Sequence, residues 1–139
     1  MLFLPAWGQH PHWQLTRADS LRKEGQVVQA MSMYRQMLAS PMDGCDEANV
    51  HAGMAFIQWN AGNVTEAKGN LTEAAKSCGT CPSTRRTNLS LDIASLMTFC
   101  GMTKGAMDIL NKEIEWRPQA SQKDEVSLAL AELHRHRGE

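Results

Sequence analysis

A pattern of small and large residues occurs three times in this chain and restricts the folds that the chain can adopt. Each copy has a glycine, an alanine five residues later and a large side chain nine residues later. The copies are Gly25, Ala30 and Tyr34; Gly62, Ala67 and Leu71; and Gly101, Ala106 and Leu110. Successive glycines are 37 and 39 residues apart, a period typical of solenoids built from repeated supersecondary units. The sequence therefore predicts a stack of similar units.

Apolar residues recur at three- and four-residue steps on both sides of each glycine, which indicates amphipathic helices. Alternation of β-branched and polar residues never extends beyond a few positions, so no strand is predicted. We expect an all-α chain of about seven helices. Their predicted ranges are Trp13–Glu24, Val27–Ala39, Glu47–Ala61, Thr65–Lys76, Thr87–Cys100, Lys104–Trp116 and Asp124–Arg137.

Each residue type in the pattern has a physical role in a helical hairpin. A chain that reverses direction within a few residues commonly needs a positive φ after its first helix, which glycine adopts without a Cβ clash. Alanine lets the paired helices approach closely, and the large residue four positions later fills the gap toward the next unit. Prolines then end the second helices or prevent their continuation, at Pro41, Pro82 and Pro118.

This combination resembles the tetratricopeptide repeat (TPR) family, whose order of Gly, Ala, large residue and Pro is matched best by Gly25, Ala30, Tyr34 and Pro41. The first helices also carry the family's small residue, at Ala18, Ala55 and Ala94. The family's leading Trp and Leu-Gly pair are poorly kept, so the repeats are divergent. The resemblance implies a right-handed α-α superhelix. Its units are expected at about 13–44, 45–83 and 84–121, with a terminal helix at 122–139.

In TPR proteins the first helices of the units line a concave groove that binds a protein or peptide. The resemblance implies the following groove residues here: Arg22, Lys23, Asn49, Phe56, Trp59, Asn60, Asn88, Leu91 and Phe99. Aromatic residues and arginine are the usual anchors of protein interfaces. The alternative is that the three aromatic residues pack between helices. Leu15 and Asp19 stand where chaperone-binding TPR proteins have Lys and Asn, so we do not expect a clamp for chaperone tails.

The four cysteines carry a separate prediction. Cys78 and Cys81 have C-x-x-C spacing, but a structural zinc site needs a second pair of ligands, and none is evident. The motif closes a helix before Pro82, whereas a thioredoxin-like motif opens one. Antiparallel pairing of the helices places Cys45 near this motif. We expect a disulfide from Cys45 to Cys78 or Cys81 in an oxidising compartment, and a free, buried thiol at Cys100.

Residues 1–9 are apolar, end in small residues and are followed by polar sequence, so the N-terminal segment 1–12 is either an arm folded over the first helix or the remnant of a signal peptide. If it is a signal remnant, a periplasmic or extracytoplasmic location is favoured over a cytoplasmic one. No apolar stretch reaches the roughly 18 residues that a membrane span needs. With 14 Lys and Arg against 15 Asp and Glu, the charge balance gives no reason to expect nucleic-acid binding.

Motifs for hydrolase, metalloprotease, phosphate-binding and dinucleotide-binding sites are absent, so we expect neither an enzyme nor a bound cofactor or metal. We interpret the chain as a scaffold that binds a protein or peptide partner in its groove. One alternative is the extracytoplasmic sensory or regulatory input domain of a larger bacterial receptor. The third possibility is a metal or redox module that depends on the cysteines.

Overall fold

The computed structural model describes residues 12–116 and 120–136, and within these ranges the chain is all-α, as predicted. Seven helices and no strand occur in this part of the chain. The helices are α2 (His12–Lys23), α3 (Val27–Leu38), α4 (Gly44–Asn60), α5 (Val64–Cys78), α6 (Ser83–Phe99), α7 (Thr103–Trp116) and α8 (Ala120–His136). The predicted N-terminal arm lies outside the described residues, except that its last residue, His12, opens α2.

Three helices begin more than one residue earlier than the sequence predicted: α4 by three residues, and α6 and α8 by four each. The reason is visible at α4, where the Asp43 carboxylate caps the helix by accepting a hydrogen bond of 2.8 Å from the backbone N–H of Asp46. At α6 the backbone N–H groups of Arg85 and Arg86 both donate to the carbonyl oxygen of Pro82 at 3.0 Å. These first turns are rich in polar residues, so apolar periodicity could not mark their starts.

The three glycines of the repeated pattern form the same turn. Their φ angles are 86° at Gly25, 86° at Gly62 and 80° at Gly101, which confirms the predicted positive values. In each turn the N–H of the following residue donates to a carbonyl five residues back, at 2.7 to 2.8 Å, as in a Schellman motif. The repeated glycine thus ends the first helix of each hairpin and starts the return.

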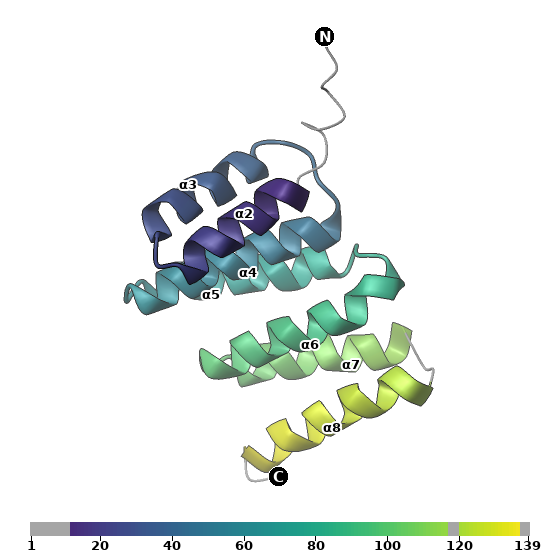
Figure 1. The fold of residues 1–139 in the computed structure, drawn as a ribbon. Coiled ribbons are helices and arrows are strands. Elements are labelled where there is room, and N and C mark those ends of the chain that lie inside the picture. Colours follow the sequence, from purple (N-terminus) through teal and green to yellow (C-terminus); the bar gives the residue numbers. More distant parts are fainter. Residues whose placement is uncertain (1–11, 117–119, 137–139) are drawn as a thin grey trace.

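Consecutive helices pack against one another, and α2, α4, α6 and α8 also contact each other in that order. In Figure 1 the hairpins lie one below another, from α2–α3 at the top to α8 at the bottom. Ala30, Ala67 and Ala106 are all 0% exposed, which confirms their predicted place between helices. Tyr34 reaches the next hairpin, because a Cβ built on Gly53 of α4 would lie only 2.5 Å from its ring.

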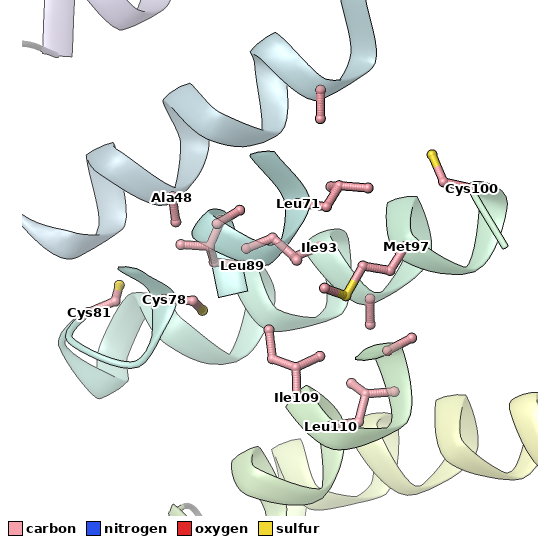
Figure 2. Close-up of a cluster of buried hydrophobic side chains, with 14 of the residues drawn as sticks. Ala48, Leu71, Cys78, Cys81, Leu89, Ile93, Met97, Cys100, Ile109 and Leu110 are labelled. Atoms are coloured by element: carbon pink, nitrogen blue, oxygen red, sulfur yellow. The ribbon is translucent and has the colours of Figure 1, made fainter. Parts of the chain in front are cut away.

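The core has two clusters of buried side chains that meet at α4. The first joins α2 and α3 to Val50, Met54 and Ile57 of α4. The second joins Ala48 and Ala55 of α4 to helices α5 to α8, and Figure 2 shows side chains from several of these helices meeting there. Because α4 contributes to both clusters, it couples the first hairpin to the rest of the molecule.

A disulfide links Cys45, at the start of α4, to Cys81, in the loop between α5 and α6. Of the two pairings that the sequence left open, the structure therefore contains the one with Cys81. Cys78 is a buried free thiol whose sulfur lies 3.3 Å from the Ser90 hydroxyl. Cys100 is also free and buried, as predicted.

A buried carboxylate, Glu113 of α7, ties this helix to α6. Its side chain is 1% exposed and accepts hydrogen bonds from Arg86 Nε at 2.9 Å, Thr87 Oγ1 at 2.7 Å and Ser90 Oγ at 3.1 Å. Burial alone would raise the pKa of Glu113, but these three donors and the Arg86 charge outweigh it and lower the pKa. The carboxylate therefore stays ionised inside the core.

Candidate partner-binding surface

Helices α2, α4, α6 and α8 form one side of the molecule, which we call the even-helix face. It contains two clefts. Cleft A, of about 190 Å³, lies between α2, α4 and α6 and is lined by Asp19, Arg22, Asn49, Ala52, Gly53, Phe56, Leu89, Asp92, Ile93 and Leu96. Cleft B, of about 310 Å³, lies between α6, α7 and α8 and is lined by Leu91, Ala94, Ser95, Thr98, Leu110, Ala129, Glu132 and Leu133.

A polar network under cleft A fixes the position of Arg22. The hydroxyl of Tyr34 donates to Asp19, and Arg22 Nε donates to the same hydroxyl at 3.1 Å. Burial raises the pKa of Tyr34 far above its usual range, and the bond to Asp19 raises it further, while Arg22 acts in the opposite direction. Tyr34 therefore remains a neutral donor. Asp19 also lies 3.8 Å from the guanidinium of Arg22.

Arg22 in turn lies over an exposed aromatic ring. Its guanidinium carbon is 5.1 Å from the ring centroid of Phe56, within the range of a cation–π contact. Phe56 is nevertheless 41% exposed, so one face of the ring remains open to solvent at the edge of cleft A. The network thus holds a basic group and an aromatic ring together on the surface of α2 and α4.

A second aromatic pair lies near the C-terminal ends of α4 and α6. The rings of Trp59 and Phe99 meet edge to face, with centroids 6.2 Å apart and planes at 62°. Trp59 packs partly against the core, whereas Phe99 is 68% exposed. The alternative prediction, that the three aromatic residues pack between helices, therefore holds in part for Trp59. Phe56 and Phe99 instead present aromatic surface to solvent.

The predicted groove residues are distributed unevenly over this face. Arg22, Asn49 and Phe56 line cleft A, and Leu91 lines cleft B. The remaining predicted polar residues are exposed but line neither cleft; they are Lys23, Asn60 and Asn88. Leu15, which stands where chaperone-binding TPR proteins have a groove residue, is instead buried in the first core cluster.

Asp92 of α6 lines cleft A and was not identified from the sequence. Burial raises the pKa of its carboxyl group, and no other described residue forms an ion pair or hydrogen bond with its side chain. The sequence places Asp92 on the same face of α6 as Asn88, four residues earlier, but does not show that Asp92 lies beside α2 and α4. Cleft A therefore contains one unpaired carboxylate beside apolar side chains of α6.

The described residues contain no cluster of three or more His, Cys, Asp or Glu side chains that could hold a metal ion. Among the same residues, no helix is both long and apolar enough to cross a membrane. Comparison with protein-family models, with curated proteins and with solved structures found no match to this chain. The resemblance to the TPR family, its right-handed superhelix and the division into units therefore stay predictions.

Proposed function

We propose that this chain is a non-enzymatic scaffold that binds a segment of a protein partner along the even-helix face. The observation that carries the proposal is the exposure of two phenylalanine rings there, Phe56 at 41% and Phe99 at 68%. Each ring is held by a neighbour, Arg22 in one case and Trp59 in the other. Because these contacts already order the rings, a partner would lose little conformational freedom on binding them.

The composition of this surface supports a protein partner. Trp, Phe and Arg are enriched where interfaces are fully buried, and they supply most of the binding energy at hot spots. The two clefts lie on either side of α6, so an extended segment that crosses α6 could place side chains in both. The resemblance to TPR proteins, which bind partners through the corresponding helices, points to the same surface.

A second candidate is the extracytoplasmic input domain of a larger bacterial receptor. The observation that favours it is the disulfide between Cys45 and Cys81, because disulfides persist in oxidising compartments and are rare in the cytosol. In this case the even-helix face would bind the signal protein or peptide. The same disulfide engages Cys81 and leaves Cys78 as the one free thiol of the C-x-x-C pair, which favours the receptor alternative over a metal site at this motif.

The test compares partner binding by three forms of the protein. The first is unchanged, the second carries Phe56→Ala with Phe99→Ala, and the third carries Val28→Ala. Val28 is a matched control because it is 80% exposed but lies on α3, outside the even-helix face. Peptides are selected from a displayed random library on the unchanged protein, and their affinities for all three forms are then measured.

We expect the double variant to bind the selected peptides at least about tenfold more weakly, because a hot-spot side chain contributes about 1–2 kcal/mol or more. The Val28→Ala protein should bind them with unchanged affinity. All three forms should remain folded with the same helix content, which circular dichroism checks, since the substituted side chains lie at the surface. Equal affinity of the unchanged protein and the double variant for every selected peptide would overturn the proposal.

A further inference from the structure

A third cleft lies away from the even-helix face, between α5 and α7, and we call it the α5–α7 cleft. Its volume is about 450 Å³, the largest of the three, and it shares no lining residue with cleft A or cleft B. It is lined by Thr72, Ala75, Lys76, Cys78, Gly79, Thr80, Met97, Met102, Gly105, Asp108, Ile109 and Lys112. The proposed partner-binding function makes no use of this space.

Small residues keep the cleft open. Helices α5 and α7 each pack against α6, and Ala75 of α5 and Gly105 of α7 line the space between them. A Cβ built on Gly105 would lie 3.3 Å from Met97 Cε, so any side chain there would enter the cleft. Glycine near the start of a helix costs up to about 1 kcal/mol relative to alanine, yet the chain has glycine at this position. The vacant volume therefore depends directly on the residue at 105.

The interior of the cleft is apolar. Met97 and Ile109 form part of its floor, and both belong to the buried cluster shown in Figure 2. Ala75 and Met102 are partly buried at its sides. A cleft of this size with apolar walls and few polar groups has the usual character of a small-molecule site, for which volumes of about 300–1,000 Å³ are typical.

The charges on its rim are not balanced. Lys76 pairs with Glu73 at 3.3 Å, and Asp108 pairs with Lys104 at 3.1 Å. Lys112, also on the rim, has no ion-pair partner among the described residues. The cleft therefore combines an apolar interior with one uncompensated positive charge at its edge.

We propose that the α5–α7 cleft binds a monoanionic amphiphile with a short apolar chain, of the class of a medium-chain fatty acid. The chain would lie on Ala75, Met97, Met102 and Ile109, and the carboxylate would face Lys112. The charge complementarity with Lys112 selects an anion over a neutral or cationic ligand of the same chain length. This inference stands independently of the partner-binding surface.

The test is a calorimetric titration of the full chain with decanoate, decanol and decyltrimethylammonium, each below the concentration at which it aggregates. Decanoate should bind at one site, decanol more weakly, and the cationic compound least. Gly105→Leu, which fills the cleft, should abolish decanoate binding. Gly69→Leu is the matched control, because Gly69 of α5 has open space around it and does not line the cleft. Ala75→Leu fills the cleft from the α5 side, and it replaces Gly105→Leu in the test if that variant does not fold.

A second comparison tests the charge. Lys112→Gln should weaken decanoate binding by up to about fivefold, as expected for one exposed ion pair, and leave decanol binding unchanged. Lys23→Gln, on α2, should change neither. The inference is wrong if decanoate does not bind, if it binds equally after Gly105→Leu and Ala75→Leu, or if Lys112→Gln weakens decanol as much as decanoate.

Discussion

Replacing Glu113 with Gln is the sharpest test of how α6 and α7 are held together. The substitution keeps the size of the side chain but removes its charge and replaces one acceptor oxygen with an NH₂ group. Oε1 accepts from Arg86 and Ser90, and Oε2 accepts from Thr87, so the NH₂ faces a donor whichever way the amide is oriented. With the NH₂ toward Arg86 the hydrogen bond from Arg86 is lost, and with the NH₂ toward Thr87 the hydroxyl must rotate to accept, so the present network cannot be kept unchanged.

The cost follows from the burial of both charged partners. Glu113 is 1% exposed and Arg86 is 8% exposed. Removing one member of a buried ion pair typically costs about 3–5 kcal/mol, because the other member stays buried and loses the opposite charge that it was paired with. We therefore expect Glu113→Gln to lower the free energy of unfolding by about 3 kcal/mol. Glu115→Gln, two positions later on the same helix, should change it by less than about 0.5 kcal/mol because Glu115 is exposed.

Urea unfolding at neutral pH, followed by circular dichroism, measures both values if the slopes of the transitions agree. A loss below about 1 kcal/mol for Glu113→Gln would refute the argument. The pH dependence of the free energy of unfolding gives a second test. Because the pKa of Glu113 is lowered on folding, its contribution is full above the usual Glu value of about 4.3 and is lost as pH falls through the lower folded value. The Gln variant should lack this part of the acid destabilisation.

Three further predictions concern the disulfide and two glycines. The Cys45–Cys81 disulfide spans 36 positions, so reducing it, or replacing both residues with Ser, should lower the free energy of unfolding by about 4 kcal/mol; unchanged urea midpoints would contradict this. Gly62→Ala should destabilise by about 1 kcal/mol although nothing lies within 4 Å of the added Cβ, because φ is 86° there. Gly69→Ala, in open space within α5, should instead stabilise by about 0.5–1 kcal/mol, and shifts of the same sign for both would refute the conformational argument.

The hairpin turns could be predicted from the sequence because their physics is local. A turn that needs positive φ selects glycine, and a close helix contact selects alanine, so Gly62 and Ala67 identify the geometry without knowledge of the rest. Which of Cys78 and Cys81 pairs with Cys45 could not be predicted from the local sequence. It depends on how α5 ends: Cys78 is its last residue and turns toward Ser90, which leaves Cys81 in the loop to reach Cys45.

The clefts could be predicted only in part, since each depends on side chains from three helices. The resemblance to TPR proteins implied groove positions at Phe56 and Leu91, and both residues line clefts on the even-helix face. Asp92 was missed because the sequence does not show which residues of α6 lie beside α2 and α4. The α5–α7 cleft was missed entirely, because nothing in the repeated pattern distinguishes Gly105 from a glycine on an open surface such as Gly69.

Helix α6 explains how one small fold can hold two separate candidate sites. On one side of this helix, Asp92 and Leu96 line cleft A, and Phe99 follows at the same helical spacing. One residue beyond Leu96, Met97 is buried and forms part of the α5–α7 cleft. A shift of one position rotates a side chain by about 100°, so Leu96 and Met97 point to different sides of the helix. Substitution of Phe99 should therefore affect binding on the even-helix face and leave decanoate binding intact, while Gly105→Leu should do the reverse.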